Sequence, residues 1–166
     1  MKWQIHSTIV VSIVMLLAPL AGEPLPILVW NASASVPVGL YTVRPSDEIE
    51  NGDLAVVRLT KDHETLLRER GIIRNRVPLI KPVAASGGQR VCRRGAEIFI
   101  DGHVVARASE RFSDGFPLPV WSGCKTLSRE AVFLLAPTEP RSFDGRYLGP
   151  TARSDVIGRA VFLWKP

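Results

Sequence analysis

Ser35 is the first candidate nucleophile in the sequence. It lies within the stretch from Asn31 to Tyr41, NASASVPVGLY, in which Pro37 and Gly39 favour a tight, exposed backbone. A serine hydroxyl is a poor nucleophile until a neighbouring base removes its proton. A catalytic role for Ser35 therefore requires a base from elsewhere in the chain.

The candidate base is Lys81. None of the three histidines, His6, His63 and His103, lies in a catalytic signature, so a Ser-His-Asp triad has little support. Lys81 lies in the apolar stretch LIKPVAA, residues 79–85. Such a lysine either extends its ammonium group to water or loses its proton, because desolvation disfavours the charged form. From this segment alone both interpretations are open, and only the neutral amine can act as a base.

The remaining composition predicts neither a metal site nor a cofactor. The two cysteines, Cys92 and Cys124, form no CxxC motif and have no histidine pair nearby, whereas a structural zinc site needs four closely spaced ligands. The chain carries a net charge of +5, but its arginines are scattered and lack interleaved aromatic residues. We therefore expect no nucleic-acid partner, and anionic lipid headgroups account for the basic charge equally well.

Residues 1–29 predict an N-terminal membrane anchor or signal-like segment. The apolar run from Thr8 to Gly22 is intermediate in length between a signal-peptide core and a spanning helix. We favour an uncleaved anchor with Lys2 on the inner side, and a cleaved secretory signal is the alternative. Trp30 is typical of a membrane–water boundary. Both interpretations export the domain, and an oxidising compartment favours a disulfide between the two cysteines.

The rest of the chain is predicted to be mainly β. Short apolar stretches bounded by turn residues indicate strands at 40–43, 53–59, 79–84, 131–135 and 156–164, with a hairpin over 97–105. The Asp-Gly pair inside that hairpin suits the positive φ angles of a type I′ turn. The stretch 62–70 begins with a capping residue and is followed by glycine, which predicts one short helix.

Three sequence boxes carry a resemblance to a known family. They are SVPVGLY at 35–41, LIKPV at 79–83 with Gly87, Gly88 and Val91 beyond it, and SFDGRYLGP at 142–150. In this order, after an N-terminal anchor, they resemble the bacterial type I signal peptidases. They are most similar to the TraF-type conjugative transfer peptidases. The resemblance covers nearly the whole chain and implies a signal-peptidase-like β fold, with residues 30–166 as a serine–lysine peptidase domain.

The resemblance also implies roles for individual residues. Ser35 would attack the scissile carbonyl and form an acyl-enzyme, and Lys81 would accept its proton. The backbone N–H of Ser35 would donate to the oxyanion, helped by the Ser33 hydroxyl. Ser142 would hydrogen-bond the Lys81 amine and orient it.

Other positions in the boxes set this chain apart from the general leader peptidases. Asp144 and Arg146 are expected to pair and hold the last box in shape. Pro82 stands where those peptidases usually have Arg, Gln89 replaces an acidic residue, and Gly145 replaces the common Ser. These departures favour the conjugative branch.

The implied function is that of a serine endopeptidase anchored in the inner membrane, with its catalytic domain in the periplasm. Its partners would be membrane lipid and a membrane-bound pilin or other exported precursor, matured by hydrolysis or by closure of the pilin into a ring. Three alternatives are a general leader peptidase, a LexA-like self-cleaving protease and a non-catalytic envelope protein of a mating-pore apparatus. The LexA class carries a DNA-binding domain where this chain has its apolar segment.

Overall fold

A computed structural model describes residues 6, 28–45, 49–74 and 77–165 of the chain. The anchor expected over residues 1–29 falls outside this part, apart from His6, Leu28 and Val29. Within the described ranges, no helix has the length and apolar character needed to cross a membrane.

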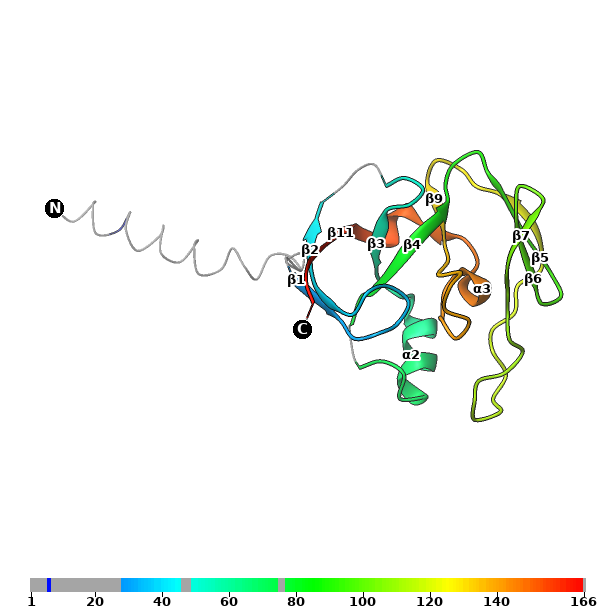
Figure 1. Ribbon diagram of the computed structural model, residues 1–166, viewed down its shortest axis with the longest axis horizontal. Helices are drawn as coiled ribbons and strands as arrows, with labels where there is room; N and C mark the ends of the chain where they lie inside the picture. The colour runs from blue at the N-terminus through cyan, green and yellow to red at the C-terminus, as the bar shows by residue number, and fades with distance from the viewer. Residues whose placement is uncertain (1–5, 7–27, 46–48, 75–76, 166) are drawn as a thin grey trace.

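The larger of two sheets is curled and contains seven strands in the order β1-β2-β11-β3-β4-β9-β10 (Figure 1). Its strands are β1 (Leu28–Asn31), β2 (Gly39–Arg44), β3 (Leu54–Val57), β4 (Leu79–Ala85), β9 (Ala131–Leu134), β10 (Thr151–Ala152) and β11 (Val156–Trp164). All neighbouring strands pair antiparallel, and Lys81 of β4 lies opposite Ala55 of β3. The candidate base therefore sits in the middle of the sheet.

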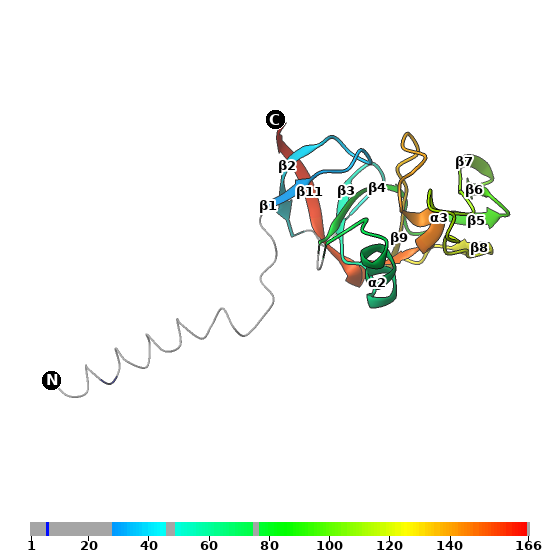
Figure 2. The same cartoon turned by 90° about the horizontal axis from the view of Figure 1, so that it is seen from below.

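The smaller sheet has four strands in the order β7-β6-β5-β8 and lies at the end of the molecule away from β1 (Figures 1 and 2). Its strands are β5 (Arg90–Arg94), β6 (Glu97–Ile100), β7 (His103–Arg107) and β8 (Gly123–Thr126). The β6–β7 hairpin turns at Asp101 and Gly102, whose φ angles are 49° and 85°. Cys92 and Cys124 face each other across β5 and β8 and form a disulfide.

Helices in the described part of the chain are few and short. Helix α2 (Lys61–Glu69) begins at Thr60, whose side chain accepts a hydrogen bond from the backbone N–H of His63. A second helix, α3 (Gly145–Leu148), and a 3-10 turn, Arg153–Asp155, follow later in the chain.

The mainly β prediction is confirmed, and each predicted strand or helix lies within a few residues of an observed one. The structure adds β1, β5, β8, β10 and α3, which the sequence patterns did not predict. Strand β5 was not predicted because three of its five residues are arginines, which normally indicate an exposed segment. One of them, Arg93, is buried, and only the tertiary structure reveals this. Strand β1 begins at Leu28, so the last two residues assigned to the N-terminal segment belong to the sheet.

The core lies on both faces of the larger sheet. Tyr41, Val56 and Ile80 belong to the cluster on one face, and Val57 and Val83 belong to the cluster on the other. The period-2 alternation of β strands produces this division, since neighbouring side chains point to opposite faces.

Reduction of the disulfide should lower the stability of the domain. The two cysteines are 32 residues apart, and the chain-entropy model gives about 3–4 kcal/mol for a loop of that length. Cys124 is exposed, so a small thiol reagent can reach the bond. We expect a lower Tm in dithiothreitol than without it, and a Cys92→Ser/Cys124→Ser double variant that does not respond to the reagent. Two alkylatable thiols in unreduced protein would contradict the bond.

Candidate active site

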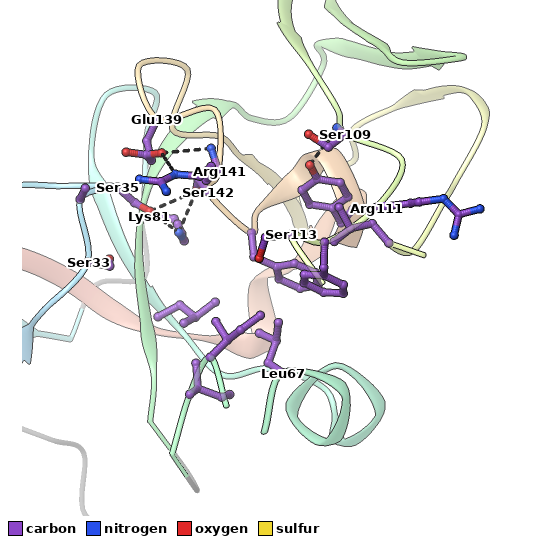
Figure 3. Close-up of a pocket in the computed structure, with 18 residues that line it drawn as sticks. Ser33, Ser35, Leu67, Lys81, Ser109, Arg111, Ser113, Glu139, Arg141 and Ser142 are labelled. Atoms are coloured by element: carbon purple, nitrogen blue, oxygen red, sulfur yellow. Dashed lines mark hydrogen bonds and ion pairs between the residues drawn. The ribbon is translucent and has the colours of Figure 1, made fainter. Parts of the chain in front are cut away.

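Three side chains from distant segments meet in one buried cluster (Figure 3). The Nζ atom of Lys81 lies 2.7 Å from Oγ of Ser35 and 2.8 Å from Oγ of Ser142. The two hydroxyl oxygens are 3.1 Å apart, with Ser35 donating to Ser142. Ser35 follows β1, Lys81 lies on β4 and Ser142 precedes α3, so only the folded chain brings them together.

Burial changes the protonation of Lys81. The side chain is 5% exposed, and desolvation lowers its pKa to about 8. Asp144 and Glu139 oppose this shift through their negative charges, whereas the nearby Arg146 adds to it. Of the two interpretations left open by the sequence, an ammonium extended to water does not fit this geometry. An amine with a pKa near 8 is partly neutral at physiological pH and can accept a proton.

The loop that carries Ser35 is held by Asn31, a buried residue at the end of β1. The Nδ2 atom of Asn31 donates to the carbonyl oxygens of Ser33, Val36 and Pro37 at 2.8, 3.0 and 3.1 Å. Its Oδ1 atom accepts from the backbone N–H of Ser33 at 3.1 Å. One amide side chain thus bonds to backbone groups on both sides of Ser35 and holds the turn that carries it.

Ser33 lies beside the cluster, but its hydroxyl is already engaged. Its Oγ atom donates to Oδ1 of Asn31 at 2.9 Å. A serine hydroxyl has one proton to donate, so Ser33 must rotate away from Asn31 before it can donate to an oxyanion.

The segment that carries Ser142 is locked by a buried ion pair. Nη1 of Arg146 lies 3.2 Å from Oδ2 of Asp144, and the two side chains are 1% and 0% exposed. Arg146 also donates to the carbonyl oxygens of Ala136, Glu139 and Ser142 at 2.8, 3.0 and 3.3 Å. Breaking a buried pair of this kind by removing one partner typically costs about 3–5 kcal/mol. The pair therefore fixes the loop 136–142 and, with it, the hydroxyl of Ser142.

The smaller sheet is fastened to the same segment. The buried side chain of Arg93 on β5 donates to the carbonyl oxygens of Arg146 at 2.6 Å and Pro119 at 3.3 Å. Nε1 of Trp121 donates to the carbonyl oxygen of Gly145 at 2.9 Å. These bonds connect α3 to the chain that leads into β8, so the second sheet helps to hold the site.

Two of the three departures from the leader-peptidase pattern, Gly145 and Gln89, have structural explanations. A Cβ atom on Gly145 would lie 2.6 Å from the carbonyl oxygen of Leu134, so no larger residue fits. Gln89 accepts from Asn51 and donates to Asp101, a combination that an acidic side chain could not make. Pro82 is part of β4 and pairs with Leu54 of β3.

A cavity of about 460 Å³ opens in front of the cluster and extends toward α2. Its lining is polar near Ser35, Lys81 and Ser142, and apolar beside α2, where Figure 3 shows Leu67. Glu139 and Arg141 stand at its rim. A peptide in this cavity would reach the Ser35 hydroxyl while most of its length contacts apolar side chains.

Across the described ranges, no three His, Cys, Asp or Glu residues lie close enough to form a metal site. The geometry instead matches a serine nucleophile beside a neutral amine. Once the hydroxyl of Ser35 turns its proton from Ser142 to Nζ of Lys81, the amine can accept that proton while it donates to Ser142, since a neutral lysine has two N–H groups and one lone pair. Acyl transfer is the chemistry that this arrangement can perform.

Comparison with known proteins agrees with the geometry. The family model described as signal peptidase, peptidase S26, matches residues 1–165. The chain belongs to this family.

Its relatives confirm the resemblance to TraF proteins. A plasmid transfer protein TraF from Escherichia coli is 31% identical over 148 residues, which cover 81% of this chain and 82% of that protein. A conjugal transfer protein TraF from Agrobacterium fabrum is 31% identical over 151 residues, which cover 82% of each chain. A signal peptidase I structure from Enterococcus faecalis matches 68% of this chain and 97% of its own, at 17% identity and a TM-score of 0.38.

Two residues that organise the site of this peptidase S26 member are not predicted by the sequence patterns. Asn31 was included only as the start of the serine segment, and Arg93 was counted only among scattered basic residues. A polar residue directly before the serine box is a faint signal for a loop anchor. No local signal reveals this role of Arg93. One of its carbonyl partners is the nearby Gly95, but the two partners that connect it to the site lie 26 and 53 residues away in the chain.

The burial of Lys81 should appear in the pH dependence of stability. Its pKa is about 8 in the folded protein and about 10.5 when unfolded, so the unfolded chain binds more protons between these values. Stability from this group therefore rises as the pH increases from 8 to 10.5, by up to about 3 kcal/mol. The Lys81→Met variant lacks this contribution. We therefore compare the free energy of unfolding of Lys81→Met with that of the native protein. The value for Lys81→Met minus the value for the native protein should fall by that amount between pH 7 and pH 10.5.

Urea unfolding at both pH values measures this difference. The exposed Lys125 on β8 supplies the control, since Lys125→Met leaves Lys81 in place and should keep the native pH dependence. Parallel pH curves for the native protein and Lys81→Met would contradict a lowered pKa.

Proposed function

We propose that this protein is a membrane-associated serine endopeptidase that uses Ser35 and Lys81 to process exported precursors, and that its substrate is a propilin of a conjugative transfer system. The observation that carries the proposal is the 2.7 Å contact between the Ser35 hydroxyl and the buried Lys81 amine. A surface lysine in the same contact would be protonated and useless as a base.

The proposed reaction follows from the hydrogen bonds of the cluster. Lys81 takes the proton of Ser35 as its oxygen attacks the scissile carbonyl, and the backbone N–H of Ser35 donates to the oxyanion. Collapse of the tetrahedral intermediate breaks the peptide bond, and the protonated amine of Lys81 gives its proton to the leaving nitrogen. Lys81 then activates water to hydrolyse the ester. The hydrogen bond to Ser142 orients the amine toward Ser35 during formation and hydrolysis of the ester.

An exposed apolar edge supports membrane association. The side chains of Leu28, Trp30, Phe162, Leu163 and Trp164 are 55%, 48%, 43%, 52% and 57% exposed. The rings of Trp30 and Trp164 lie 6.5 Å apart, at the end of the molecule where the described body begins (Figures 1 and 2). Tryptophan is favoured at membrane interfaces. This edge and the apolar run from Thr8 to Gly22 are consistent with an active site held at the outer face of the inner membrane.

The names of the relatives support the choice of substrate. Two of them are described as transfer proteins, one for plasmid and one for conjugal transfer. A peptidase of the signal peptidase family in such a system has a natural substrate in the membrane-bound pilin precursor. The acyl-enzyme on Ser35 can react with water or with the amino terminus of the pilin, which would close a ring.

Loss of either member of the pair should abolish processing. Ser35→Ala removes the nucleophile and Lys81→Met removes the base, so each variant should retain under about 1% of the native kcat/KM. The double variant should be no worse than either single variant, because the two residues act as one unit. Circular dichroism checks that each variant is folded. A Lys81→Met variant with native activity would contradict Lys81 as the base. Unimpaired conjugative transfer with both Ser35→Ala and Lys81→Met would instead favour a non-catalytic envelope protein.

The pH profile of the native enzyme tests the state of the base. Protonated Lys81 cannot accept a proton, so kcat/KM should rise about tenfold per pH unit below 8 and level off above it. A profile that is flat from pH 6 to 9 would contradict Lys81 as the base.

Ser142→Ala should slow catalysis without ending it. The Ser142 hydroxyl orients the amine at 2.8 Å but does not react. Loss of one such hydrogen bond costs about 1–3 kcal/mol, or roughly tenfold to a hundredfold in kcat. Ser142→Thr keeps a hydroxyl and should recover part of the rate. Native kinetics for Ser142→Ala would place the last box outside the mechanism.

The mass of processed pilin tests whether pilin is the substrate and whether the acyl-enzyme ends in hydrolysis or in ring closure. We expect co-expression with the pilin gene of the same transfer region to convert the precursor to a shorter product, with Ser35→Ala as the control. A product one water heavier than the ring indicates hydrolysis, and the lighter mass indicates ring closure. Unprocessed pilin beside active enzyme on other precursors would favour a general leader peptidase.

A further inference from the structure

The apolar end of the cavity is larger than the reaction needs. The cavity has a volume of about 460 Å³, within the range that accommodates whole small-molecule ligands. Positioning a carbonyl group beside Ser35 uses only the polar end. The remaining space lies between α2 and the chain that follows β7, on the side of Leu67 in Figure 3.

Two segments far apart in sequence form the walls of this space. One wall comprises α2 and the turn after it, with Leu67 and Ile73, and the other is the loop of residues 109–118, which we term the arm loop. In Figure 1 the arm loop extends beside α2. Phe112 of the arm loop stacks on Phe143, with ring centroids 6.3 Å apart and an interplanar angle of 9°. Side chains of Leu118 and Phe143 form the buried floor.

Arg70 fastens the two walls together. Its Nη1 atom lies 3.3 Å from Oδ2 of Asp114, and its guanidinium carbon lies 3.5 Å from the centre of the Phe116 ring. The arm loop is also closed on itself, since the N–H of Phe112 donates to the carbonyl oxygen of Phe116 at 2.8 Å. The space is therefore bounded by walls that hold their own shape.

The lining of this end determines the kind of group that can bind. Leu67, Ile73, Phe112, Leu118 and Phe143 present hydrocarbon surface, and Ser109, Arg111 and Ser113 supply the polar part of the arm-loop lining. Between the five apolar residues a charged side chain would lose its hydration, whereas an aliphatic or aromatic side chain would gain from burial. Small side chains would leave most of the space unfilled and forgo those contacts.

We propose that the apolar end between α2 and the arm loop is a specificity subsite that binds one large aliphatic or aromatic side chain of the peptide substrate. The subsite is continuous with the cavity at Ser35, so its occupant is part of the same peptide that is cleaved. This inference rests on the proposed peptidase function. It places substrate selection partly in α2 and the arm loop, outside the three sequence boxes.

The test uses internally quenched peptides based on alanine, serine and lysine, with leucine or phenylalanine introduced at one position at a time on either side of the scissile bond. Peptide binding is measured on the full-length Ser35→Ala variant in detergent, and cleavage is measured on the Ser35 protein. At one position, phenylalanine should bind about tenfold tighter or more than alanine.

Two variants change the size of the subsite. Ile73→Trp fills it and should remove the preference for phenylalanine over alanine at that position. Phe112→Ala enlarges it and should shift the preference toward tryptophan. This second variant tests the subsite even if Ile73→Trp does not fold. Val104→Trp, on an exposed position of β7 outside the cavity, is the matched control and should keep the native preference.

The outcomes separate this proposal from the peptidase function. Cleavage with no preference at any position, or a preference unchanged in both cavity variants, overturns the subsite and leaves the peptidase function standing. A position-specific preference that responds to the cavity variants, but without cleavage by the Ser35 protein, supports the subsite and overturns the peptidase function.

Discussion

The burial of Lys81 is the constraint on which the rest of the site depends. Strand β4 carries this side chain into the interior, where desolvation outweighs the attraction of Asp144 and Glu139 and lowers its pKa to about 8. A buried polar group without a partner costs about 1–3 kcal/mol, so the amine needs hydrogen bonds. Ser35 and Ser142 are its partners at 2.7 and 2.8 Å. Ser35, which would give its proton to the amine, and Ser142, which would orient the amine, are thus also the groups that stabilise it.

Polar side chains hold the two loops of the cluster, the one that carries Ser35 and the one that carries Ser142. Asn31 satisfies three carbonyl oxygens of the serine loop, and Arg146, held by Asp144, satisfies three carbonyl oxygens of the segment that ends at Ser142. Neither arrangement is hydrophobic packing. In loops without regular backbone pairing, such side chains supply the bonds that a strand would otherwise provide. A small displacement of either loop would separate the hydroxyls from the amine, so these contacts control the geometry.

The second sheet contributes to the site through its connections. Arg93 and Trp121 tie α3 to the chain on either side of the Cys92–Cys124 disulfide, and the arm loop forms one wall of the cavity. The disulfide joins an exposed edge strand to β5, so it stabilises the region from which that wall extends. The disulfide adds to a core cluster in which Val91 and Ile98 of this sheet pack with Phe133 of the larger one. The fold thus places Lys81 on the larger sheet and one wall of the cavity on the loop between β7 and β8 of the smaller sheet.

The sequence by itself determined the chemical groups and most of the strands. The serine, lysine and late boxes, the strand periodicity and the Asp-Gly turn are local features, and local patterns are enough to recognise them. Tertiary structure decided the protonation of Lys81, because desolvation depends on every neighbour and not on the apolar residues beside it in the chain. It also decided the role of Arg93, whose bonds to Pro119 and Arg146 form only once segments 26 and 53 residues apart have packed together. Asn31 and Ser33 bond within their own turn, but the sequence pattern does not specify which of their side-chain atoms are engaged there.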